Sequence, residues 1–175
     1  NPDDDDAVVE SDLSILTPKL RSVDVSADGN CGFYVMSLIQ HGGLDVSDKK
    51  QMLSLAQTLR KTIYEAFETS ATPYTLDGNS LRTYKALKVD KMGWASDLDF
   101  KVFGSLHKTN ICCISSAAEG RSTNIKTVLL DSSFDRVAFI INIDHTTASV
   151  LRHSPGFSHF VAVGNSTNTR FAFAL

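Results

Sequence analysis

The most constraining feature of this sequence is the stretch of residues 28–34, Asp-Gly-Asn-Cys-Gly-Phe-Tyr. Residues 21–27 before it favour a short extended segment, and residues 33–40 after it form an apolar run typical of a buried helix. Cys31 is therefore expected at a glycine-containing turn that opens a helix. The unpaired N–H groups and the dipole of a helix N-terminus favour negative charge, so they can stabilise a thiolate or an oxyanion there. The alternative is that Cys31 is a small apolar residue of the core.

The composition excludes several classes of protein. The formal net charge of −3 does not indicate a surface that binds nucleic acid or an anionic membrane. No apolar run approaches the ~20 residues that span a bilayer, so we expect no membrane contact. Three cysteines, of which Cys112 and Cys113 are adjacent, do not make a disulfide framework. A reducing compartment is therefore expected, and we predict the cytoplasm.

The 175 residues are enough for one domain with a hydrophobic core. Residues 1–12 are acidic and lack hydrophobic periodicity, which predicts a flexible tail, so the folded domain should span residues 13–175. The first residue is not methionine, and we expect a monomeric domain of a larger protein.

Helical patterns come first in the domain, and strand patterns follow. Ser47 is the expected N-cap of an amphipathic helix over residues 48–68, and shorter helices are predicted over residues 80–89 and 95–106. Apolar or β-branched runs separated by polar turns then predict strands at residues 111–114, 127–130, 137–143, 160–163 and 171–175. This order predicts an α+β fold, in which helices pack around a mainly antiparallel sheet.

A cysteine nucleophile needs a base near its sulfur, and histidine is the natural base at neutral pH. His159 is the best-placed candidate because it begins the apolar strand at residues 160–163, where rigid backbone would hold it near the surface. The alternative is a histidine that only packs at the end of a strand. The other histidines end helices or lie in polar turns: His41, His107, His145 and His153.

The residues Asp28-Gly29-Asn30-Cys31, followed by an apolar helix, resemble the active-site motif of the OTU (ovarian tumour) family of papain-like cysteine proteases. These are mostly deubiquitinases. Ser158-His159-Phe160 resembles the late histidine of that family, which an aromatic residue follows, and residues 94–100 resemble its Trp-led helix start. The resemblance covers roughly residues 23–163. It implies an OTU-like papain-type fold and a thiol isopeptidase that acts on conjugates of ubiquitin or ubiquitin-like proteins, without a cofactor or metal.

Carried over to this sequence, the resemblance makes Cys31 the nucleophile. His159 would be the general base, and later the acid that protonates the leaving amine. Backbone N–H groups of Cys31 and of the turn formed by Asp28, Gly29 and Asn30 would make the oxyanion hole. Asp28 would shape the turn, and its main chain would matter more than its charge.

The third member of the triad departs from a common pattern of the family. Two residues after His159 stands Val161, which cannot accept a hydrogen bond from an imidazole. Asp24, seven residues before Cys31, matches a subset of the family with an upstream acid, so Asp24 is the predicted third residue. Its extended segment could run beside the strand of His159. The alternatives are a Cys–His dyad, Asn165 and Asn168.

Other features receive more modest interpretations. Trp94 is expected to fix the start of its helix against the core, or alternatively to line the cleft for a substrate tail. Cys112 and Cys113 should point to opposite faces of a strand as core thiols, and no metal site is expected. The loops at residues 67–79 and 143–157 are hypothesised to contribute to the substrate surface.

Two other functions remain open. One is a papain-like protease domain that processes a polyprotein and is viral in origin; for a viral or bacterial effector, the host cytoplasm would be the place of action. The other is an OTU-like module that binds ubiquitin without cutting it.

Overall fold

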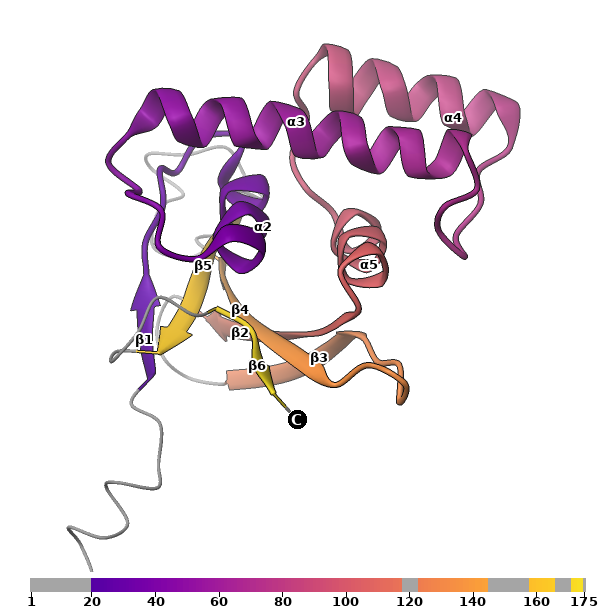
Figure 1. Cartoon of the computed structure of the whole chain (residues 1–175). Helices are drawn as coiled ribbons and strands as arrows, with labels where there is room; N and C mark the ends of the chain where they lie inside the picture. The colour runs from indigo at the N-terminus through magenta and orange to yellow at the C-terminus, as the bar shows by residue number, and fades with distance from the viewer. Residues whose placement is uncertain (1–19, 118–122, 145–157, 166–170, 175) are drawn as a thin grey trace, which may run out of the picture.

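The computed structural model describes residues 20–117, 123–144, 158–165 and 171–174. Helices and strands follow one another as expected, and the described helices lie on one face of a mixed sheet (Figure 1), so the α+β prediction is confirmed. The predicted tail and the residues His145, His153 and Asn168 lie outside the described residues. None of the helices in the described ranges is long and apolar enough to cross a membrane.

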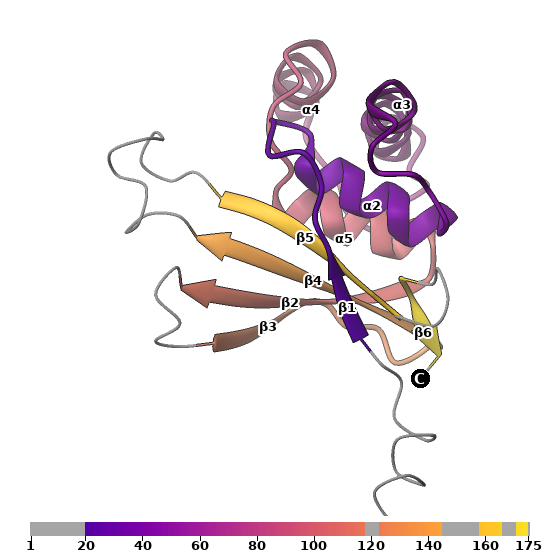
Figure 2. The ribbon, with the colours of Figure 1, turned by 90° about the vertical axis from the view of Figure 1, so that its left-hand side faces the viewer.

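The helices form two layers above the sheet. In Figure 2, α2 and α5 lie against the sheet, and α3 and α4 form an outer layer. Residues 31–39 of α2 are all buried, because this helix is covered by the sheet on one side and by α3 on the other. The helical elements are α2 (Cys31–His41), α3 (Lys49–Glu68), α4 (Gly78–Tyr84), the π-helical turn η1 (Lys85–Asp90) and α5 (Asp97–Leu106).

Local hydrogen bonds set the helix ends. Helix α2 stops at Gly42, which has a φ of 60° that favours glycine. The predicted N-cap of α3 at Ser47 was wrong by one residue. Asp48 caps this helix instead, since its carboxylate accepts the N–H of Gln51 at 3.1 Å, while the Ser47 hydroxyl donates to Asp45.

The helix predicted over residues 80–89 is divided in two. The α-helix α4 begins at Gly78, directly after its N-cap Asp77. The chain then continues as the wider π-helical turn η1. Helix α5 begins two residues later than predicted. The N–H of Ser96 donates to the Asp99 carboxylate at 2.7 Å, which closes the first turn of α5.

The sheet has the strand order β1-β5-β4-β2-β3, and β6 pairs with β4. Only the β2–β4 pairing among the described strands is parallel, so the mainly antiparallel prediction holds. The predicted final strand is shorter than expected. The strands are β1 (Leu20–Val23), β2 (Thr109–Ala117), β3 (Thr123–Leu129), β4 (Arg136–Asp144), β5 (Ser158–Asn165) and β6 (Phe173–Ala174).

Candidate active site

Cys31 is the first residue of α2, as predicted, and only 7% of it is exposed. The turn before it is held by the side chain of Asp28. One carboxylate oxygen accepts the N–H of Asn30 at 2.8 Å, and the other accepts the Tyr34 hydroxyl at 3.0 Å. The N–H of Cys31 donates to the Asp28 carbonyl at 3.2 Å. The side chain of Asp28, and not only its main chain, therefore shapes the turn.

Tyr34 is a proton donor in this arrangement. Burial raises the pKa of Tyr34 to about 12, and the hydrogen bond and negative charge of Asp28 add to this effect. The Asn30 side chain and the Arg60 charge oppose it. The phenol therefore stays protonated at neutral pH and keeps donating to Asp28.

The Cys31 turn lies against the start of β5, the strand that carries His159. A Cβ placed on Gly32 would lie 3.4 Å from Cδ2 of Phe160 and only 2.5 Å from Cβ of Ala95. Phe160 in turn packs against Phe100 of α5, with ring centroids 5.1 Å apart. The residues that follow Cys31 and His159 are thus packed together, so the fold brings the two segments to one place.

Asp24 directly follows β1. Because β1 is antiparallel to β5 and Val23 lies opposite Ala162, β1 runs in the direction of the end of β5 that carries His159. The predicted neighbourhood of this segment and the His159 strand is confirmed. The alternative acid, Asn165, ends the same regular strand, roughly 20 Å along it from His159. Asn165 is therefore far from His159 along the strand, and Asp24 stays a prediction.

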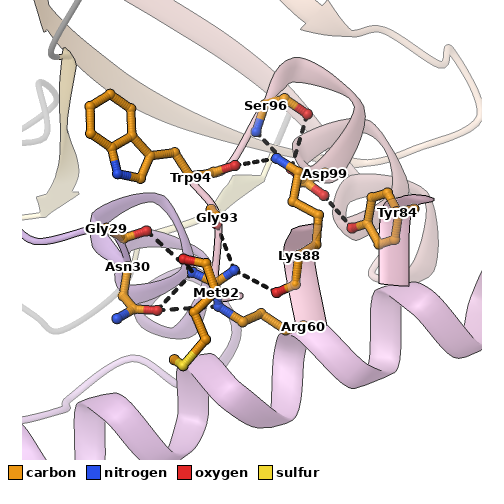
Figure 3. Close-up of polar contacts among 10 residues, drawn as sticks. All are labelled: Gly29, Asn30, Arg60, Tyr84, Lys88, Met92, Gly93, Trp94, Ser96 and Asp99. Atoms are coloured by element: carbon orange, nitrogen blue, oxygen red, sulfur yellow. Dashed lines mark hydrogen bonds and ion pairs between the residues drawn. The ribbon is translucent and has the colours of Figure 1, made fainter. Parts of the chain in front are cut away.

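Arg60 is a residue of the site that sequence reasoning missed. It lies in α3, is 1% exposed, and donates hydrogen bonds to the turn before Cys31 and to the segment before α5 (Figure 3). A signal was present in the sequence. Arg60 falls four residues after Ala56 and three before Ile63, on the apolar face of the helix. Arginine is almost never fully buried without partners, so such a position indicates a buried polar site.

A buried carboxylate anchors the segment between η1 and α5. Asp99 is completely buried; it accepts hydrogen bonds from the backbone and hydroxyl of Ser96 and from the Tyr84 hydroxyl, and it pairs with Nζ of Lys88 at 3.1 Å. The same Lys88 ammonium bonds to the carbonyl of Trp94. Figure 3 shows that Lys88 of η1 contacts both the Trp94 carbonyl and Asp99 of α5, so these contacts link the Trp94 backbone to η1 and α5.

The expectation that the Trp94 indole fixes the start of its helix against the core was wrong. Its side chain is 47% exposed, and its Cδ1 and Nε1 atoms lie 3.2 Å from the position that a Cβ on Gly29 would occupy. The indole therefore lies beside the Cys31 turn and not inside the core. The alternative, in which Trp94 lines the cleft for a substrate tail, stays a prediction.

The other two cysteines have the surroundings of structural thiols. Cys113 is buried in the core, Cys112 is partly exposed, and burial raises the pKa of the Cys112 thiol. None of the three cysteines, all of which lie in the described ranges, forms a disulfide. In the part of the chain that the structure describes, no group of three or more His, Cys, Asp or Glu side chains is arranged to hold a metal ion.

Comparisons with known proteins bear on the fold. No protein-family model matches the chain, and no curated protein has a similar sequence. Among solved structures, the viral OTU domain protease of Taggert virus matches with a TM-score of 0.57 and 15% identity, over 87% of this chain and 83% of that one. The Hazara virus OTU bound to ubiquitin matches with a TM-score of 0.51 and 14% identity, over 83% of this chain and 81% of that one. The OTU domain of OTUD1 matches with a TM-score of 0.52 and 18% identity, over 83% of this chain and 86% of that one. The chain therefore has the OTU fold, as predicted.

Proposed function

We propose that this chain is a deubiquitinase-type thiol isopeptidase, which hydrolyses ubiquitin or a ubiquitin-like modifier from lysine side chains. The observation that carries the proposal is the contact between Gly32 and Phe160, because it packs the segment of Cys31 against the segment of His159 within an OTU fold. The Hazara virus protein of the same fold is bound to ubiquitin in its structure.

In the proposed reaction, His159 takes the proton of the Cys31 thiol, and the sulfur attacks the isopeptide carbonyl. The tetrahedral intermediate then collapses, the C–N bond breaks, and His159 gives its proton to the leaving lysine amine. A thioester between the modifier and Cys31 remains. Water, deprotonated by His159, attacks this thioester, which releases the modifier's carboxylate and restores the thiol.

The turn supplies the donors that would stabilise the oxyanion. The N–H of Cys31 makes a rather long bond of 3.2 Å to the Asp28 carbonyl, so this bond can be exchanged for one to the substrate oxygen. The N–H of Asn30 is bound at 2.8 Å to the Asp28 carboxylate and would first have to leave it. We therefore expect Cys31 to contribute the main donor among these two.

Asp24 completes the proposed site as the acid that orients the His159 ring. The antiparallel pairing of β1 with β5 supports this role. We also propose the cytoplasm as the place of action, or the host cytoplasm for an effector, because a working thiol at Cys31 would suit a reducing compartment.

The test is the hydrolysis of ubiquitin joined by an isopeptide bond to a fluorescent lysine. Wild type should release the lysine, and Cys31→Ala and His159→Ala, checked for unchanged folding, should not. Binding of ubiquitin without hydrolysis by wild type would replace the proposal with a non-catalytic ubiquitin-binding module. Hydrolysis restricted to peptide junctions would replace it with a polyprotein-processing protease.

A further inference from the structure

The guanidinium of Arg60 is buried between two segments that lie far apart in the sequence. Figure 3 shows the Arg60 side chain reaching from α3 toward Asn30 and Met92. Its Cζ atom also lies 4.0 Å from the centroid of the Phe33 ring. Burial lowers the pKa of Arg60, and the nearby charge of Asp99 is the main effect that opposes this. No ion pair joins Arg60 to a carboxylate in the described ranges. A buried cation without such a partner depends on its hydrogen bonds.

On one side, Arg60 binds the turn before Cys31. Its Nε and Nη2 atoms donate to Oδ1 of Asn30 at 3.2 and 2.7 Å, and Nη2 also donates to the carbonyl of Gly29 at 3.2 Å. The same peptide group carries the N–H of Asn30, which the Asp28 carboxylate accepts at 2.8 Å. The peptide between Gly29 and Asn30 is thus held at both ends, which fixes the plane of the peptide group next to the one that carries the Cys31 N–H.

On the other side, Arg60 binds the segment that leads to Trp94. Its Nη1 atom donates to the carbonyl of Gly93 at 2.6 Å, and Nη2 donates to the carbonyl of Met92 at 3.1 Å. Nη1 also donates to the carbonyl of Lys88 in η1 at 2.8 Å. One planar group therefore sets the spacing between the Cys31 turn and the segment that carries the exposed indole.

We propose that Arg60 is a positioning residue for the reaction of Cys31: it holds the Gly29–Asn30 peptide, and thereby the next peptide group, so that the Cys31 N–H faces the oxyanion. The inference rests on the proposed function. Arg60 does not touch the reacting atoms. Its loss should therefore weaken stabilisation of the tetrahedral intermediate, and should change substrate binding and the intrinsic reactivity of the thiol much less.

The test compares wild type, Arg60→Lys and Arg60→Met, with Arg82→Lys and Arg82→Met as matched controls. Arg82 is exposed on α4 and donates to the Asn79 side chain. Each variant is assayed for kcat and KM on a fluorogenic ubiquitin substrate, for the rate of Cys31 alkylation by iodoacetamide, and for melting temperature. Lysine keeps the charge but lacks the planar fork that joins three segments. The kcat values are expressed per active site, so that an unfolded fraction does not lower them.

For Arg60→Lys we expect kcat to fall about 10- to 100-fold, which is the scale for a weakened oxyanion site, with KM and the alkylation rate within about threefold of wild type. The Arg82 variants should match wild type. A wild-type kcat in Arg60→Lys, or equal losses in kcat and alkylation rate, would overturn the inference while the proposed function stands. A wild-type protein that does not hydrolyse the ubiquitin substrate would contradict both the inference and the proposed function, and this result needs no variant.

If the Arg60 variants do not fold, Asn30→Ala provides the test, because it removes the acceptor of two Arg60 bonds and leaves the bonds to Lys88, Met92 and Gly93. It should show the same fall in kcat with little change in KM. An Asn30→Ala variant with wild-type kcat would overturn the inference. Where Arg60→Lys does fold, the double variant Arg60→Lys/Asn30→Ala should lose no more kcat than the more severe single variant, since both changes remove the same link between Arg60 and Asn30. A double variant whose loss in kcat equals the product of the two single losses would contradict the inference.

Discussion

Gly32 and Phe160 are in contact: a Cβ on Gly32 would lie 3.4 Å from Cδ2 of Phe160. Each of these residues directly follows a member of the proposed catalytic pair, so this contact sets how closely the start of α2 can approach β5. Ala95 closes the contact from the other side, at 2.5 Å from the same Cβ position.

Gly32→Ala should therefore destabilise the fold by about 1–3 kcal/mol, because the added methyl group overlaps Ala95. The measurement is urea unfolding, read as a lower midpoint with an unchanged m-value. Gly78→Ala is the matched control, since no atom lies within 4 Å of its Cβ position. A Gly32→Ala variant as stable as Gly78→Ala would show that the approach is looser than described.

Trp94→Ala should raise KM for a ubiquitin substrate by about tenfold, which corresponds to ~1.4 kcal/mol of lost binding. The reason is that the exposed indole stands beside Gly29, where it can line the path of the substrate tail. The melting temperature should change little, because half of the side chain is already in water. Leu130→Ala, at a residue that is 74% exposed, controls for the loss of an exposed apolar side chain. Equal KM values for both variants would exclude a specific role for Trp94.

Asp24→Ala should lower kcat by roughly 10- to 100-fold, and Asp24→Asn by less, because an amide can still accept a hydrogen bond from the His159 ring. Steady-state kinetics on the isopeptide substrate checks this. Asp45→Ala is a control carboxylate from the loop between α2 and α3. Wild-type activity in Asp24→Ala would leave a Cys–His dyad as the better description.

The stability of the protein should fall between pH 10 and pH 12, in part through Tyr34. Its pKa is about 12 in the folded protein and 10.0 without the effects of the fold. A raised pKa means that the folded state holds the proton more tightly. The stabilisation is therefore complete below pH 10 and is lost as the pH approaches 12. Thermal melts should show a loss on the order of 2 kcal/mol that is absent in Tyr34→Phe. Parallel stability curves for the two proteins would contradict this assignment.

Much of the fold could be predicted because the apolar patterns are strong. The apolar run after Cys31 predicted α2. The helix over residues 80–89 was only partly right, because local propensity does not distinguish a π-helical turn from an α-helix. That turn also takes part in a long-range contact, since its Lys88 carbonyl accepts a hydrogen bond from Arg60.

The candidate site was predicted as a set of residues, but its support was not. The pairing of β1, which directly precedes Asp24, with β5 is a long-range contact that the sequence could only suggest. Arg60 was missed because its role depends on carbonyls of Gly29 and Gly93, which no side-chain pattern reveals. The position of Trp94 was predicted wrongly because its indole is exposed and lies beside Gly29 of the distant Cys31 turn, a contact that the local sequence does not indicate.

The most direct test of the account uses ubiquitin with a thiol-reactive electrophile at its C-terminus, followed by peptide mapping of the product. We predict one covalent adduct, located on Cys31, that is lost in Cys31→Ala and slowed in His159→Ala. Cys112 and Cys113 should stay unmodified. No adduct on the folded wild type, or an adduct on Cys112 or Cys113 in place of Cys31, would contradict the account.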